Sequence, residues 1–168
     1  MQNSDLEEKA LTKARNAAYR FLAYRPRSRA EIDTKLHDKE FNDAIIEAVL
    51  SDLARLGYVN DLQFALGWTR SRITLRGFGR RRIGQELKSK GIGPEIIREV
   101  FAEVFSDETE IETARRVAGK KMNTMMSLDR ETRRRRLAGF LERKGFSFEI
   151  IRDVLKSTES FLPRMDTD

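Results

Sequence analysis

The stretch Ile32–Leu50, IDTKLHDKEFNDAIIEAVL, decides the fold because the chain contains it three times in diverged form. A shift of 51 residues places it on Ile83–Phe101, IGQELKSKGIGPEIIREVF, and a further shift of 54 places it on Leu137–Leu155, LAGFLERKGFSFEIIRDVL. Five apolar columns stay in register across the copies, and in the first copy they are Leu36, Phe41, Ile45, Ile46 and Val49. A period of this length is typical of tandem structural repeats.

Within each copy the apolar residues recur at the three- and four-residue spacing of one helix face, and no segment alternates as a strand does. We therefore expect an all-α protein, an elongated array of three tandem three-helix repeats that resemble helix-turn-helix units. The expected boundaries are residues 1–60, 61–106 and 107–160, followed by a loose tail at 161–168. Charged residues make up 36% of the 168-residue chain, which favours small units stacked in line over one large core.

Local signals mark several helix ends. Ser28 and Glu31 have the spacing of a capping box, and Asp61 is placed to cap the helix that follows it. Gly91 and Gly145 follow the second helix of repeats 2 and 3, where a left-handed residue is expected. Repeat 1 has Glu40 at this position, so its turn must differ or carry strain.

The composition excludes much enzyme chemistry. The chain has one His, His37, and no Cys, so disulfides, thiol nucleophiles and Cys-based zinc sites are excluded. We expect no enzyme activity, no cofactor and no metal. The first residues, MQNSDLEEKALTK, are acidic and unlike a signal peptide, and no apolar stretch approaches the ~20 residues that span a bilayer. These features predict a cytoplasmic protein that does not contact a membrane.

Charge is unevenly distributed along the chain. The net charge is +6, but residues 1–60 are neutral, whereas residues 70–90 carry +7 and residues 115–144 carry +8. Two basic stretches in one chain indicate an anionic partner. The candidate partner- or nucleic-acid-binding residues are Arg70, Arg72, Arg76, Arg80, Arg81, Arg82, Lys88, Arg133, Arg134, Arg135 and Arg136.

The run Arg80–Arg82 is the strongest of these candidates. It falls in the first turn of a helix, where cations oppose the helix dipole, so fold stability does not call for them. Helical spacing places Arg80 nearest the packed side and directs Arg81 and Arg82 outward. Replacing all three with Gln is expected to leave stability unchanged or slightly raised. The preceding Gly-rich turn could hold an anion at the helix N-terminus, although it matches no nucleotide-binding motif.

Three motifs in this chain resemble the RecX family. They are RPRSRAEIDTKL at Arg25–Leu36, LARLGYVNDLQFA at Leu53–Ala65 and GRRRIGQELKSKGI at Gly79–Ile92. The similarity extends over roughly residues 14 to 157, and the third repeat is the looser match. The family is built of tandem three-helix repeats, in agreement with the period found above.

The resemblance implies a bacterial cytoplasmic modulator of RecA that has no catalytic site. Members of the family bind the helical groove of the RecA–DNA filament and bridge neighbouring subunits. In most cases they inhibit ATP hydrolysis, strand exchange and coprotease activity. The partners expected for this chain are therefore the RecA filament and, weakly, single- or double-stranded DNA, and we expect a monomer.

Two other functions fit the same residues. Three-helix units with a basic second helix could form a stand-alone helical-repeat DNA-binding protein, for which affinity for DNA would not require RecA. In such a protein an aromatic residue like Trp68 could stack on a base, but Trp68 lies four residues after Phe64, which is core spacing, so we expect it in the core. The array could also be a protein scaffold whose charge only aids solubility.

Overall fold

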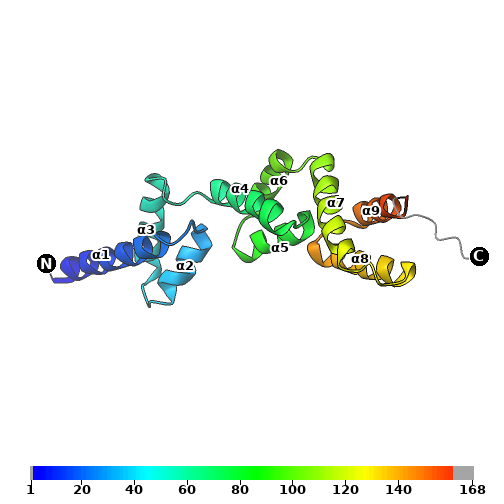
Figure 1. Cartoon of the computed structure of the whole chain (residues 1–168). Helices are drawn as coiled ribbons and strands as arrows, with labels where there is room; N and C mark the ends of the chain where they lie inside the picture. The colour runs from blue at the N-terminus through cyan, green and yellow to red at the C-terminus, as the bar shows by residue number, and fades with distance from the viewer. Residues whose placement is uncertain (1, 161–168) are drawn as a thin grey trace, which may run out of the picture. The chain divides into compact units, whose positions relative to one another are not determined.

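The structure is a computed structural model that describes the backbone of residues 2–160 and the side chains of residues 5–106 and 109–158. Within these residues it is all-helical, as the sequence predicts, and no described residue belongs to a strand (Figure 1). One π-helical turn, η1, interrupts the α-helices. The bounds are α1 Gln2–Leu22, α2 Arg29–His37, α3 Asp43–Arg55, α4 Asp61–Ser71, η1 Arg72–Arg76, α5 Arg80–Ser89, α6 Pro94–Val104, α7 Asp107–Asn123, α8 Arg130–Lys144 and α9 Phe148–Ser160.

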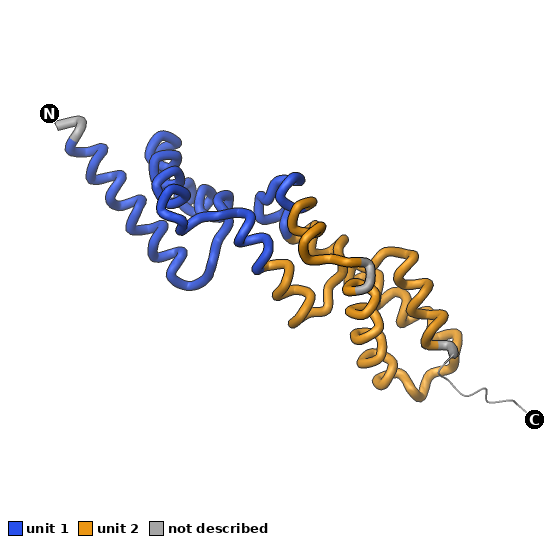
Figure 2. Tube along the Cα trace, turned by 90° about the horizontal axis from the view of Figure 1, so that it is seen from above, with its two compact units in different colours: residues 1–67, 87–97 blue, residues 68–86, 98–168 orange. Residues whose placement is uncertain are grey.

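Contacts divide the chain into two compact units, which Figure 2 shows in blue and orange. Among the described residues, unit 1 contains those up to Gly67 together with Leu87–Ile97. Unit 2 contains Trp68–Glu86 together with those from Arg98 onward. Unit 1 thus holds α1–α3 and unit 2 holds α7–α9, so the first and third predicted repeats each lie within one unit.

The core of unit 1 lies among α1, α2 and α3, which pack against one another. The apolar columns of the repeat supply it: Leu36, Ile46 and Val49 are all buried. Ala14 and Ala18 of α1 complete it, and their small side chains allow that helix to approach closely.

The core of unit 2 lies among α7, α8 and α9 and uses the same columns of the third repeat. Leu141, Phe146 and Val154, the counterparts of Leu36, Phe41 and Val49, are fully buried. The agreement confirms that the repeated apolar pattern specifies the helical packing within each unit.

Helix α2 begins with the predicted capping box. The Ser28 hydroxyl accepts from the Glu31 backbone N–H at 3.1 Å, and the Glu31 carboxylate accepts from the Ser28 backbone N–H at 3.2 Å. The expectation for Asp61 is wrong, since the side chain that caps α4 is the preceding Asn60, which accepts a backbone N–H at 3.0 Å. Asp61 instead accepts from the backbone N–H of Arg29 at 2.8 Å, so it supports the start of α2.

The turns after the second helices adopt the expected left-handed backbone. Gly91 and Gly145 have φ angles of 74° and 90°. Glu40 has a φ angle of 62° and is the only non-glycine residue with a positive φ in the described part of the chain. Repeat 1 therefore keeps the same turn at the cost of backbone strain.

Candidate functional site

The start of α2 meets the end of α5 within unit 1, and we call this contact the unit-1 junction. The Ser28 hydroxyl donates to the carbonyl oxygen of Lys90 at 2.6 Å. A Cβ placed on Gly91 would collide with the Cβ of Ala30, so the two backbones approach as closely as glycine allows. The Lys90 ammonium donates to Glu31 at 3.1 Å, which neutralises the cation at this helix end.

Glu31 is the charge centre of the unit-1 junction. Besides Lys90, its carboxylate pairs with Arg25 at 2.7 Å and with Arg27 at 3.8 Å, while its side chain is only 18% exposed. Burial by itself raises the pKa of Glu31. Hydrogen bonds from Arg25, from the Ser28 backbone and from Lys90 outweigh burial and hold that pKa below its ordinary value.

An equivalent contact occurs within unit 2, where the start of α5 meets the end of α8, and we call it the unit-2 junction. The Gly79 backbone N–H donates to the Lys144 carbonyl at 2.9 Å, and the Arg81 N–H donates to the Gly145 carbonyl at 3.1 Å. A Cβ on Gly145 would collide with the backbone nitrogen of Arg82. Gly79 and Lys144 stand at the repeat positions of Ser28 and Lys90, so the backbone arrangement recurs.

The charges of the unit-2 junction differ, because Arg82 stands at the repeat position of Glu31. The Arg82 guanidinium lies 3.9 Å from the centroid of the Phe78 ring and donates to the Arg143 carbonyl at 3.0 Å. The carboxylate of Glu86 is 3.7 Å from the Arg82 Nε. The Arg82 side chain is 43% exposed, in line with the expectation that it faces outward, but it lies across a ring and a helix end and has internal partners.

Lys144 closes α8 without a carboxylate partner among the described residues. Its ammonium donates to the carbonyl of Arg76 at 2.6 Å and lies 5.0 Å from the centroid of the Phe78 ring. Burial lowers the pKa of Lys144, and the positive charges of Arg82, Arg76 and Arg116 lower it further. Like charges thus meet where unit 1 has a carboxylate.

Arg80 lies against the packed side, as its spacing predicts, but it has a structural role. Its Nε is 2.9 Å from an oxygen of Glu110, whose side chain is only 6% exposed. Its backbone N–H donates to the other Glu110 oxygen at 2.9 Å, and Nη2 donates to the Phe105 carbonyl at 3.0 Å. The carboxylate of Glu110 therefore occupies the helix N-terminus that the Gly-rich turn was expected to offer to an external anion.

Arg70 and Arg72 are also paired within unit 2. Arg70 pairs with Glu103 at 2.6 Å, and Arg72 pairs with Glu86 at 2.6 Å while its guanidinium lies 3.9 Å from the centroid of the Trp68 ring. The prediction that Trp68 belongs to the core is wrong. Trp68 is only partly buried, and its indole N–H donates to Glu86 at 2.9 Å.

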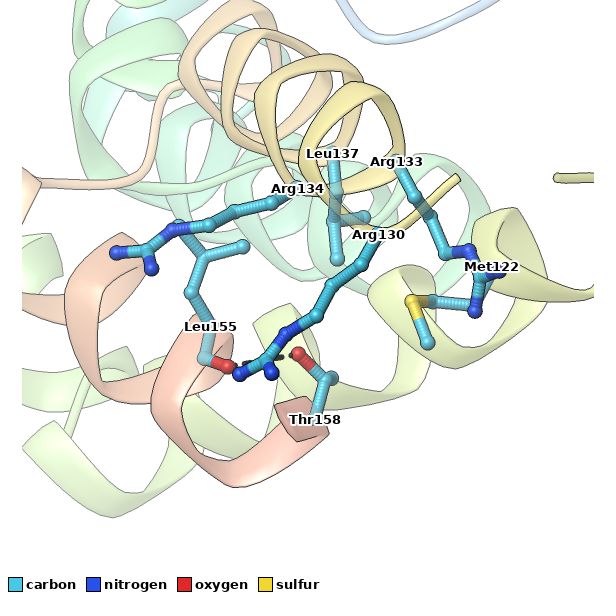
Figure 3. Close-up of a pocket in the computed structure, with 7 residues that line it drawn as sticks. All are labelled: Met122, Arg130, Arg133, Arg134, Leu137, Leu155 and Thr158. Atoms are coloured by element: carbon cyan, nitrogen blue, oxygen red, sulfur yellow. Dashed lines mark hydrogen bonds between the residues drawn. The ribbon is translucent and has the colours of Figure 1, made fainter. Parts of the chain in front are cut away.

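The four arginines 133–136 fall in the second turn of α8, as expected, because Asp129 caps the helix. Arg133 donates to the Leu128 carbonyl at 2.6 Å. Beside them a pocket of only about 20 Å³ is lined by Met122, Arg130, Arg133, Arg134, Leu137, Leu155 and Thr158 (Figure 3). That volume suits a single water, and the Thr158 hydroxyl bonds to the Leu155 carbonyl within it. This pocket is too small to bind a larger ligand.

Unit 2 contains a larger, basic groove that sequence reasoning missed. Its volume is about 290 Å³, and none of the described residues that line it is acidic. Its cationic members come from η1, α7 and α8, and we call the set the groove cations: Arg76, Arg116, Lys120, Lys121 and Lys144. Of these only Arg76 was a predicted site residue. The signal in the sequence was the excess of basic residues at 115–144, which does not reveal which of them converge.

Ten of the eleven predicted site residues divide into two groups, and the remaining one, Arg134, lines the small pocket of Figure 3. The structure gives internal partners to Arg70, Arg72, Arg80, Arg82 and Arg133. Within the described residues, five exposed cations that the sequence predicted have no carboxylate partner for their side chains: Arg76, Arg81, Lys88, Arg135 and Arg136. Lys88 belongs to unit 1 and the other four belong to unit 2.

Membrane-spanning and metal-binding features are absent from the described residues. No described helix has the length and apolar character needed to cross a membrane. No cluster of three or more His, Asp or Glu residues could bind a metal ion in the described part of the chain. His37 is exposed, and its ring nitrogens contact the carboxylates of Asp33 and Asp43.

Comparisons with known proteins agree on one family. Models of the first, second and third three-helix domains of RecX match residues 14–53, 60–100 and 108–155. The regulatory protein RecX of Amycolatopsis mediterranei is 35% identical over 149 residues, covering 89% of this chain and 85% of that protein. The regulatory protein RecX of Streptomyces coelicolor is 37% identical over 147 residues, covering 85% of this chain and 78% of that protein.

A solved structure shows the same fold. The crystal structure of RecX from Lactobacillus salivarius has a TM-score of 0.82 to this chain at 24% sequence identity. The likeness covers 91% of this chain and 99% of that one. At this identity it supports the arrangement of helices and nothing about partners.

Proposed function

Because this chain belongs to the RecX family of regulatory, non-enzymatic proteins, we propose that it regulates RecA by binding the RecA–DNA filament. In this proposal the chain occupies the helical groove of the filament and bridges neighbouring subunits. It acts mainly as an inhibitor that reduces ATP hydrolysis, strand exchange and coprotease activity.

The observation that carries the proposal is the set of exposed, unneutralised cations in unit 2. Arg81, Arg135 and Arg136 are exposed and have no carboxylate partner among the described residues. Such side chains add little to the stability of the chain itself, so they are available to phosphates or to acidic groups of a filament. In our proposal the internally paired arginines, such as Arg80, stabilise the helices that carry these exposed cations.

The test is the steady-state ATPase activity of RecA on single-stranded DNA, titrated with this protein. The parent should slow hydrolysis, as the family resemblance implies, at less than one molecule per RecA subunit. Neutralising Arg81, Arg135 and Arg136 together with Gln should raise the concentration needed for half-inhibition and make it less sensitive to salt. No effect of the parent at a one-to-one ratio in low salt would contradict the RecA assignment.

A matched control removes the same charge elsewhere. Lys9, Lys13 and Lys39 are exposed in unit 1 and have no carboxylate partner among the described residues, and replacing all three with Gln should leave inhibition unchanged. An equal loss in both triple variants would mean that net charge matters and the predicted surface does not.

We also propose that the protein acts as a monomer in the bacterial cytoplasm, with weak affinity for single- or double-stranded DNA. Two features stay predictions: the elongated shape, and the in-line arrangement of repeats with boundaries at 1–60, 61–106 and 107–160. The predicted tail at 161–168 lies outside the described residues. The alternative, a stand-alone DNA-binding protein, predicts full function in the absence of RecA. DNA binding without any change in RecA activity would favour it.

A further inference from the structure

The groove cations of unit 2 form a cluster that nothing in the described chain neutralises. Five positive side chains line about 290 Å³, and none of them pairs with a described carboxylate. The proximity of like charges is unfavourable unless an anion binds among them. We propose that this groove binds the phosphate backbone of a single nucleic-acid strand. The inference deepens the proposed function, on which it rests for the presence of DNA beside the protein.

Two of the groove cations are held in place before any ligand arrives. The Lys144 ammonium donates one of its three hydrogens to the Arg76 carbonyl at 2.6 Å, and Arg116 donates to the Ile73 carbonyl at 3.1 Å. Both acceptors are carbonyl groups of the π-helical turn η1. Each cation retains unused donors, so a phosphate oxygen would meet groups that have already lost much of their side-chain freedom.

Three of the five groove cations are lysines and two are arginines, and both residue types bind phosphate. A lysine offers a compact point charge that binds phosphate, and the two arginines add planar guanidinium groups that match phosphate geometry. Phosphates also follow one another closely along a strand, so one strand can present successive charges to Arg76, Lys120 and Lys121.

The size of the groove favours one strand over a duplex. A volume of about 290 Å³ is at the lower limit of small-ligand pockets, so the groove can hold a short stretch of one strand. A duplex, whose major groove alone is about 12 Å wide, is too broad to enter it. The aromatic ring in the groove, Phe140, has the ammonium groups of Lys121 and Lys144 at 5.8 and 5.4 Å from its centroid. Because lysines already lie near this ring, we expect contact with the backbone and no preference among bases.

The experiment measures fluorescence anisotropy of a labelled oligothymidylate with the full chain in the absence of RecA, over a range of salt concentrations. The test variant replaces Lys120 and Lys121 with Gln, which has near-equal helix propensity. Because this variant lacks two phosphate-binding cations, its affinity at 0.1 M salt should fall on the order of tenfold, and the slope of log affinity against log salt should become shallower by about 1.4. The matched control replaces Lys9 and Lys13 of α1 with Gln and should bind like the parent.

Three outcomes would overturn the inference. The test variant could bind the oligonucleotide as the control does. An oligoglutamate peptide could compete as well as an unlabelled oligonucleotide of equal charge, which would identify an acidic protein as the ligand. Pyrophosphate could bind the parent more tightly than the test variant while the oligonucleotide binds both with equal affinity, which would identify a site for small anions. Because RecA is absent, none of these outcomes depends on whether the chain inhibits RecA, and the ATPase titration tests that proposal separately.

Discussion

The unit-1 and unit-2 junctions share a backbone arrangement and carry opposite charges. In each, the start of one helix donates a hydrogen bond to the carbonyl of a lysine that closes another helix, Lys90 or Lys144, beside a left-handed glycine. Unit 1 places the carboxylate of Glu31 beside its lysine, and unit 2 places Arg82 there. The comparison teaches that the left-handed glycine and a hydrogen bond to the lysine carbonyl define the contact, with the Ser28 hydroxyl as donor in unit 1 and the Gly79 backbone N–H in unit 2. The charged position decides whether the contact is satisfied internally or open to an anion.

The largest effect should come from breaking the shared backbone geometry at Gly145. Alanine there would adopt a left-handed conformation that costs about 1–2 kcal/mol, and its Cβ would meet the backbone of Arg82. We expect Gly145→Ala to lower the free energy of unfolding by about 2–3 kcal/mol, measured by urea denaturation.

Two further glycines make this result interpretable. Gly91→Ala should destabilise by a comparable amount, since its Cβ would meet Ala30 at the equivalent place. Gly119→Ala in α7 has free space around its Cβ and should stabilise by up to about 1 kcal/mol through helix propensity. If Gly145→Ala unfolds like the parent, the shared geometry of the two junctions is not present in solution.

The next effect separates the charges of the junctions. Glu31→Gln keeps a side chain that can complete the capping box but removes the negative charge shared by Arg25, Arg27 and Lys90. We expect a decrease of about 2 kcal/mol in the free energy of unfolding, because the variant leaves these cations without a counter-charge at a largely buried position. Glu47→Gln, at an exposed ion pair with Arg29, should change stability little in the same measurement.

The pH dependence of Glu31→Gln follows from the lowered pKa of Glu31. Since the folded pKa is below the unfolded one, the carboxylate contributes its full stability above the unfolded value. That contribution is lost as the pH falls below the unfolded value and through the folded one. The difference in free energy of unfolding between the parent and Glu31→Gln should therefore be constant near neutral pH and become smaller in acid. A difference that is unchanged by acid would contradict the assignment of the effect to this carboxylate.

A smaller effect is expected within the first turn of α5. Arg80→Gln removes a cation from a buried carboxylate, that of Glu110, which keeps the hydrogen bond from the Arg80 backbone. We expect a decrease of about 1–2 kcal/mol in the free energy of unfolding. Arg81→Gln, one residue away, removes an exposed and unpaired cation from the same turn and should be neutral or slightly stabilising. Thermal unfolding of the two variants side by side measures the difference.

These contrasts also mark what the sequence could predict. The capping box of Ser28 and Glu31 and the left-handed turns at Gly91 and Gly145 follow from neighbours a few residues apart, so local chemistry was sufficient. The repeated apolar columns determined the helices and the core, because burial follows periodicity directly. The dipole argument for Arg80–Arg82 considered only the helix that carries them, so it omitted Glu110.

The groove could not be derived in this way. Its cations come from Arg76 in η1, from α7 and from Lys144 in α8, and only the tertiary packing of unit 2 brings them together. Trp68 shows the same limit, since its spacing indicated a core residue, whereas it is only partly buried and its indole N–H donates to Glu86. Charge counts showed that an excess exists, and the structure was needed to show which side chains share it.

The smallest effect on stability is expected at Arg82, the repeat counterpart of Glu31. Arg82→Gln removes the Phe78 contact and the bond to Arg143, but it also removes a like charge from beside Lys144. These changes oppose each other, so the free energy of unfolding near neutral pH should change by less than about 1 kcal/mol. The pKa of Lys144, followed by NMR of its labelled side chain, should rise toward the ordinary lysine value. It should stay below that value because burial is the larger cause of the shift.

The sign of the pH effect makes this prediction specific. In the parent the folded pKa of Lys144 lies below the unfolded one, so the unfolded state binds more protons between the two values. Stability therefore gains a contribution as the pH rises through that alkaline window, and the gain should shrink in Arg82→Gln. Glu31→Gln and Arg82→Gln place the same neutral residue at equivalent repeat positions. The first should remove an acid-sensitive stabilisation from unit 1, whereas the second should relieve an electrostatic repulsion in unit 2. An unchanged pKa of Lys144 would show that Arg82 and Lys144 do not interact in solution, and the contrast between the two junctions would then reduce to Glu31 alone.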